Sequence, residues 1–192
     1  MAEVHVLFGV AAGVLDLVTS LVYMRSILAR ETKPDRVTWW ILTIANGMIT
    51  ASYIASGARA TIWLPCMCTL GFLVVAVMSV RYGEGPLTLS RLDRVSLVVA
   101  LSSALVWRAV HSPVPGLVMN ICTEVVGLVP TIHKAYHRPW TESRASWVLA
   151  TTASLLNVLA IGDPRLVIAA YPLYVFLTNV LITYFILRKR AS

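Results

Sequence analysis

The stretch VLDLVTSLVYMRSILARETKPDRVTWW (residues 14–40) contains the features that decide the fold. An apolar run carries Asp16 in its middle, where a carboxylate in a membrane is costly, and a basic turn with two tryptophans follows. Shifting the chain by 108 residues brings CTEVVGLVPTIHKAYHRPWTESRASW (122–147) under 14–39, so that Asp16 meets Glu124. The identities that follow without a gap include Arg30 with Arg138, Arg36 with Arg144, Trp39 with Trp147, Thr43 with Thr151 and Ala45 with Ala153. We therefore interpret the chain as an internal duplication.

The composition indicates a membrane protein. Of the 192 residues, 58% are hydrophobic and 13% are charged, and the mean hydropathy is +0.76. A soluble domain carries about 25% charged residues. The apolar residues form long blocks, and a spanning helix needs about 20 of them. The sequence predicts an all-α integral membrane protein with seven transmembrane helices, at 4–24, 37–56, 60–80, 94–110, 114–133, 145–161 and 166–187.

The distribution of basic residues predicts the orientation. With the N-terminus outside, the inside segments hold thirteen of the 16 Lys and Arg, and the outside segments hold Arg59, Arg108 and Arg165. Cytoplasmic loops carry this kind of excess. We therefore expect an N-out, C-in topology, which requires an odd number of spans.

The repeat predicts how the seven helices are organised. At an offset of 107, Pro65 meets Pro172 and Arg81 meets Arg188, so the first three helices match the last three. Residues 1–82 would form one three-helix-bundle repeat, residues 83–112 a linker and connector helix, and residues 113–192 the second repeat. Because the single connector returns the chain to its starting side, the two repeats of this 3+1+3 plan are parallel.

This plan resembles the SWEET/PQ-loop superfamily of small transporters. The segment GLVPTIHKAYHRPWTESRASW (127–147) is similar to a PQ-loop, with Pro130-Thr131 where the family has Pro-Gln. The first repeat has Val22-Tyr23 at the same place. The resemblance implies the fold and a transport or receptor function. It also implies a cavity role for Asn179, because sugar-transporting relatives use an asparagine on the last helix.

The candidate binding residues are polar groups at bilayer depth. A buried acid must face the bundle interior, pair or be protonated, so Asp16 and Glu124 would take up protons or bind a substrate amine. The alternative is a neutral carboxylic acid that bonds a neighbouring helix. Further polar side chains recur on helix faces that would line a cavity or form interhelical hydrogen bonds, and they include Asn120, Thr43, Asn46, Thr151 and Asn157.

Two tryptophans and three prolines complete the candidate set. Trp39 and Trp147 would anchor the helices at the interface, or form a cytoplasmic gate or stacking surface. The prolines Pro65, Pro130 and Pro172 lie inside predicted spans, where kinks can act as hinges. The sequence shows no metal spacing, no cofactor motif and no set of nucleophile and base, so we expect neither a cofactor nor an enzyme.

These features predict a small-molecule transporter with alternating access between the two bundles, with proton coupling as an option. Sugars, amino acids, vitamins and nucleosides all remain open as polar substrates. The alternatives are a cargo- or ligand-binding receptor or scaffold of the same fold, and a lipid scramblase. We expect a multi-pass protein of the bacterial cytoplasmic (inner) membrane, in contact with lipids and not with nucleic acid. Assembly into a homo-oligomer is left open.

Overall fold

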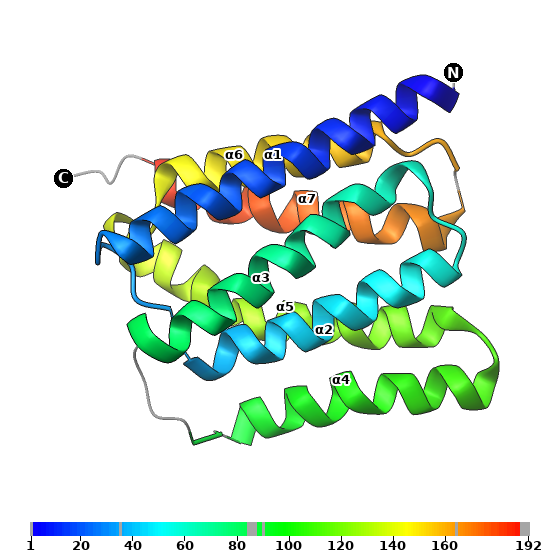
Figure 1. Ribbon diagram of the computed structural model, residues 1–192, viewed down its shortest axis with the longest axis horizontal. Helices are drawn as coiled ribbons and strands as arrows, with labels where there is room; N and C mark the ends of the chain where they lie inside the picture. Colours follow the sequence, from blue (N-terminus) through cyan, green and yellow to red (C-terminus); the bar gives the residue numbers. More distant parts are fainter. Residues whose placement is uncertain (1, 35, 84–87, 90, 164, 189–192) are drawn as a thin grey trace.

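The computed structural model describes residues 2–34, 36–83, 88–89, 91–163 and 165–188. Within these residues all regular secondary structure is helical, and successive helices run in opposite directions along one axis (Figure 1). The seven α-helices and two short 3-10 helices are α1 (Ala2–Leu28), α2 (Arg36–Ala55), η1 (Ala60–Ile62), α3 (Trp63–Tyr82), α4 (Arg91–Val110), α5 (Pro113–His137), η2 (Pro139–Thr141), α6 (Arg144–Leu159) and α7 (Leu166–Leu187). The seven helices predicted from the sequence are confirmed.

Local sequence signals account for the helix ends. The hydroxyl of Ser143 accepts a hydrogen bond from the backbone N–H of Ser146 and so caps the start of α6. Pro113 opens α5, where a missing N–H removes no intrahelical bond. After α2 the chain turns through Gly57, whose φ of +86° suits glycine. These signals are short-range, so the sequence positions the helix ends within a few residues.

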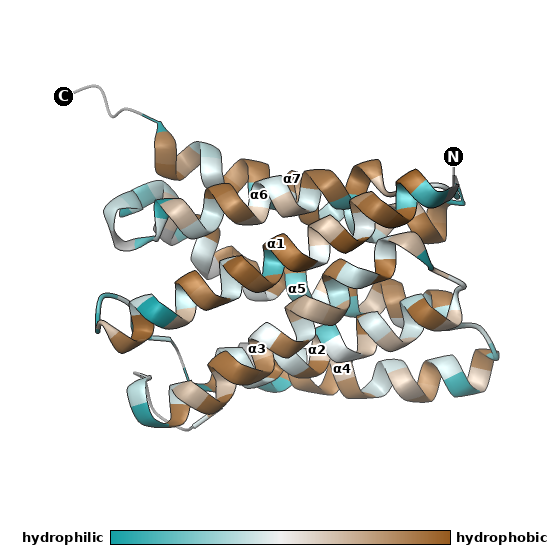
Figure 2. Ribbon diagram, turned by 45° about the horizontal axis from the view of Figure 1, so that its top comes forward, coloured by the Kyte–Doolittle hydropathy of each residue, from teal (hydrophilic) through white to brown (hydrophobic). Residues whose placement is uncertain are grey.

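The helices expose apolar side chains along their length. Five segments of the described chain are long and apolar enough to cross a membrane: α1, α2, η1 with α3, α5 and α7. Large apolar side chains such as Leu105, Leu166 and Leu177 are well exposed, and hydrophilic residues gather mainly at the helix ends (Figure 2). Such an exposed apolar surface is typical of contact with lipid. The prediction of a membrane protein is therefore supported.

Two helices fall short of the other five as spans. Helix α6 has 16 residues, or roughly 24 Å, against a hydrocarbon core of about 30 Å. Helix α4 begins with Arg91 and carries Arg108 in its last turn. That α4 and α6 cross the bilayer remains a prediction.

The helix contacts follow an exchange pattern, in which the main contacts of α1, α2 and α3 have counterparts among those of α5, α6 and α7. Helix α3 packs against α1 and α2, and α7 packs against α5 and α6. Between these groups, α1 packs against α6, and α2 packs against α5. Helix α4 contacts α5 and α2 and lies at one edge of the molecule (Figure 1). Exchanging α1, α2 and α3 for α5, α6 and α7 therefore reproduces the main contacts.

Small residues bring α1 close to η1 and to α3. A Cβ added to Gly9 would overlap the carbonyl oxygen of Ala60, and one added to Gly13 would lie 3.0 Å from the Cβ of Trp63. About two turns further along the two helices, a Cβ on Gly71 would overlap the hydroxyl of Ser20. Small residues four apart are the usual means of close helix packing in membranes. This contact holds α1 and α3 beside the buried acids described next.

Candidate functional site

Both intramembrane acids lie inside the helix bundle. Asp16 on α1 is 7% exposed, and Glu124 on α5 is 5% exposed. Each therefore faces other helices and not the surrounding lipid. Both acids are interior groups, as expected. That they bind substrate or protons remains a prediction.

Glu124 ends a chain of hydrogen bonds across three helices. The side-chain amide of Asn46 on α2 donates to Glu124 Oε1 at 2.6 Å, and Asn46 Oδ1 accepts from the Thr69 hydroxyl on α3 at 2.8 Å. The hydroxyls of Thr50 and Thr69 lie 2.9 Å apart. Thr69 also lies 2.8 Å from the carbonyl oxygen of Pro65, and its single proton can serve only one acceptor. If Thr50 donates to Thr69, then Thr69 donates to Asn46 and Asn46 donates to Glu124, so each group in the chain has a hydrogen-bond partner.

Cys68 and Tyr171 lie close to both acids. The Cys68 thiol on α3 faces the Asp16 carboxyl and the Tyr171 hydroxyl, and it is close enough to Glu124 to feel its charge. Tyr171 on α7 is fully buried and lies near Asn46. Helices α1, α2, α3, α5 and α7 thus contribute to one polar cluster. We call Asp16, Asn46, Cys68, Glu124 and Tyr171 the central cluster.

Several buried polar atoms have no hydrogen-bond partner within the described residues. Asp16 Oδ2 and both side-chain polar atoms of Asn157 form no hydrogen bond within the described residues. The hydroxyl of Tyr174 lies beside Glu124 and also forms none. Buried polar groups are normally satisfied, so unused capacity of this kind indicates a place for water or a ligand.

The other predicted polar residues are divided among different interfaces. Asn120 donates to Ser103 on α4 at 2.7 Å and therefore ties α5 to the edge helix. Asn179 donates to Ser154 at 3.2 Å, and Thr151 lies 2.8 Å from the Thr183 hydroxyl, so both join α6 to α7. Thr43 donates to the carbonyl of its own helix at Trp39. The structure therefore places Asn46 and the two acids together, but it places these four residues elsewhere.

The repeat-equivalent tryptophans occupy equivalent packing positions. The Trp39 ring lies 5.3 Å from the Tyr23 ring on α1 and 5.4 Å from the Phe72 ring on α3. Trp147 packs against a cluster from α5 and α7, and its indole N–H donates to Glu142 at 3.1 Å. Each tryptophan thus packs between two helices of its own half.

The three prolines differ in their positions. Pro65 is the third residue of α3, so it removes no hydrogen bond from the helix interior. Pro172 lies inside α7. Pro130 lies within α5, and its side chain is outside the described residues. A proline has no backbone N–H to donate, so Pro130 and Pro172 each interrupt the hydrogen bonding of a helix interior. A hinge at any of the three prolines remains a prediction.

Two hollows are present away from the central cluster. One of about 580 Å³ lies at the ends of α1 and α3 and is lined by Ile27, Arg30, Thr32, Lys33, Arg81 and Tyr82. The other, of about 400 Å³, lies along α6 and α7 beside Thr151 and Thr183 and is mainly apolar. Among the residues described, no group of three metal-ligating side chains occurs. The second hollow is mainly apolar, so it is not the polar, lipid-facing groove that a scramblase needs.

Sequence reasoning missed Cys68, Thr69, Tyr171 and Tyr174. Cysteine and tyrosine are compatible with a lipid-facing position, so residue type alone does not single them out. A usable signal was the position of Thr69, one turn after Pro65, and of Tyr171, directly before Pro172.

Searches of protein-family models, curated proteins and solved structures find nothing that matches this chain.

Proposed function

We propose that the chain is a small-molecule membrane transporter built on the SWEET/PQ-loop plan. In this proposal α1–α3 and α5–α7 are parallel three-helix repeats, α4 is the connector, and the repeats rock against each other to give alternating access. The exchange pattern of helix contacts supports the two repeats. The proposed N-out, C-in orientation has the basic ends of α1 and α3 in the cytoplasm.

The observation that carries the proposal is the central cluster. Acids at equivalent positions of the two halves, Asp16 and Glu124, are both buried, and Cys68 on α3 lies close to both. Charged groups inside a membrane are expensive and mark substrate or proton pathways. A rocking motion between the halves would separate these helices and open the cluster to one side at a time. Asp16 and Glu124 would then hold a polar substrate or carry the coupled protons.

Uptake into proteoliposomes tests this proposal. Purified protein is reconstituted and supplied with labelled sugars, amino acids, vitamins and nucleosides, with and without a pH gradient. We expect saturable uptake of one class, reduced at least about tenfold by Asp16→Asn or Glu124→Gln, because either change removes an ionisable group from the site. Stimulation by an inward proton gradient would support coupling.

Two exposed acids supply matched controls. Asp163→Asn and Glu3→Gln make the same chemical changes outside the bundle and should leave uptake unchanged. If uptake survives both central substitutions, the central cluster is not the site. If a ligand stabilises the protein against heat but never crosses the bilayer, the chain is a receptor and not a transporter.

A further inference from the structure

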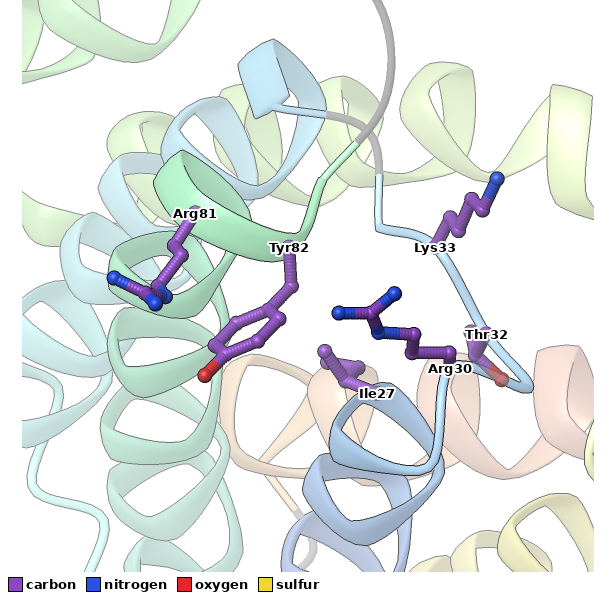
Figure 3. A pocket seen from close by; sticks show the side chains of 6 residues that line it. All are labelled: Ile27, Arg30, Thr32, Lys33, Arg81 and Tyr82. Atoms are coloured by element: carbon purple, nitrogen blue, oxygen red, sulfur yellow. The ribbon is translucent and has the colours of Figure 1, made fainter.

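The hollow between the ends of α1 and α3 is strongly basic. Arg30 and Lys33 come from the segment after α1, and Arg81 comes from the last turn of α3. Figure 3 shows the Arg30 guanidinium projecting into the space between the two helix ends, toward the Tyr82 ring, with Arg81 on the far side of that ring. The Arg81 guanidinium carbon lies 5.8 Å from the Tyr82 ring centre.

The described residues leave these charges uncompensated. The described part of the chain, which omits Asp35 and Glu84, shows no carboxylate paired with Arg30, Lys33 or Arg81. Glu31 follows Arg30 directly but does not line the hollow. The remaining lining groups are the hydroxyl-bearing Thr32 and Tyr82 and the buried Ile27. The hollow therefore offers cations and hydrogen-bond donors, and it suits an anion.

The backbone at Arg30 gives a second, independent indication. Its φ is +61°, a left-handed conformation that favours glycine and costs an ordinary residue free energy. It occupies the position after α1 at which helices usually place glycine. An arginine at such a position is expected where its side chain is needed, and here that side chain enters the hollow.

We propose that this hollow binds a phosphate-bearing anion. The planar guanidinium of Arg30 matches the geometry of phosphate oxygens, and Lys33 and Arg81 add charge at the rim. A volume of about 580 Å³ falls within the usual range for small-molecule sites. The hollow lies at the ends of α1 and α3, two helices long and apolar enough to cross a membrane. If both helices span the bilayer, this end lies at the depth of lipid headgroups, where basic pockets bind phosphate-bearing lipids. A free phosphate compound has the same chemistry.

Binding to the full-length protein in detergent micelles tests the proposal. The probes are dihexanoyl phosphatidic acid and inorganic pyrophosphate, with dihexanoyl phosphatidylcholine and sodium chloride of matched ionic strength as references. We expect saturable binding of at least one phosphate probe and a dissociation constant raised at least about tenfold by Arg30→Gln, because a charge-assisted bond to phosphate is lost. Binding of the lipid alone would identify the bilayer as the source, and binding of both would point to a free phosphate compound as well.

The matched control is Arg25→Gln. Arg25 is exposed in the last turn of α1, so its loss lowers the surface charge of the same end without altering the hollow. We expect it to change the dissociation constant less than about twofold, because screened surface charges act weakly. Equal losses in both variants, or no saturable binding of either phosphate probe, would overturn the proposal. If Arg30→Gln does not yield folded protein, Arg81→Gln serves as the test variant with the same criterion.

Discussion

The hydroxyl of Tyr53 on α2 donates a hydrogen bond to the backbone carbonyl of Ile168 on α7. Ile168 lies four residues before Pro172, so its carbonyl is the one that loses its helical partner to the proline. Tyr53 is fully buried, and its oxygen also lies 2.7 Å from the Thr61 hydroxyl. A side chain from one proposed repeat therefore repairs a break in the backbone of the other.

We expect Tyr53→Phe to lower the free energy of unfolding by about 1–3 kcal/mol, because it leaves the buried Ile168 carbonyl unpaired. Pro172→Ala restores an N–H at that position, which can bond Ile168 within the helix. The cost of Tyr53→Phe should therefore be smaller by at least about 0.5 kcal/mol when Pro172→Ala is present. Denaturant or thermal unfolding in detergent of wild type, the two single variants and the double variant measures this difference. Additive costs would show that Tyr53 does not compensate for the proline.

How far the sequence predicts this structure depends on the range of each signal. The boundaries of α2 and α7 follow from apolar blocks and local breakers, and the predicted 37–56 and 166–187 agree closely with Arg36–Ala55 and Leu166–Leu187. The burial of Asp16 and Glu124 follows from the cost of a charge in lipid. These predictions need only the residues themselves and their immediate neighbours.

The composition of the site depends on which helices face each other, and the sequence does not specify that directly. The repeat predicts that Asp16 and Glu124 are equivalent, but not that Cys68 lies close to both of them. Asn120 shares a helix face with Glu124, yet it bonds to Ser103 on α4 because α5 contacts two helices on that side. Helix packing thus separates residues that helical periodicity groups together.

The close approach of α1 to α3 predicts a steric effect at Gly9. The methyl group added by Gly9→Ala would overlap the Ala60 carbonyl, so α1 would have to move, at a cost of about 1–3 kcal/mol. Gly47→Ala is the matched control, because its Cβ would lie 3.8 Å from the nearest Thr69 atom. In a helix interior that change should be neutral or stabilise by up to about 1 kcal/mol. Thermal unfolding midpoints compare the two, and equal midpoints would contradict the tight contact at Gly9.

The loop before α7 predicts a pH effect outside the membrane. The Arg165 guanidinium lies 2.6 Å from Asp163 Oδ2, and its hydrogen bond holds the pKa of Asp163 below the ordinary value of 3.8. The folded state therefore favours the ionised carboxylate, which stabilises the protein above about pH 4 and ceases to do so as pH falls through the lowered pKa. We expect Asp163→Asn to melt slightly earlier than wild type at about pH 6, with the difference vanishing once the pH falls below the lowered pKa of Asp163 and shrinking in high salt. A difference that persists unchanged at low pH would exclude this charge effect.

The end of α1 predicts opposite effects of Arg30 on stability and on anion binding. The backbone N–H of Arg30 donates to Ile27 O, and that of Glu31 donates to Ser26 O, both at 3.0 Å, which closes the helix around a left-handed Arg30. Arg30→Gly and Arg30→Ala remove the same side chain, but only glycine relieves the backbone. Arg30→Gly should therefore exceed Arg30→Ala in free energy of unfolding by about 1 kcal/mol, while both lose phosphate binding. Unfolding in detergent without phosphate measures the difference, and equal stabilities would show that the conformation at Arg30 carries no strain.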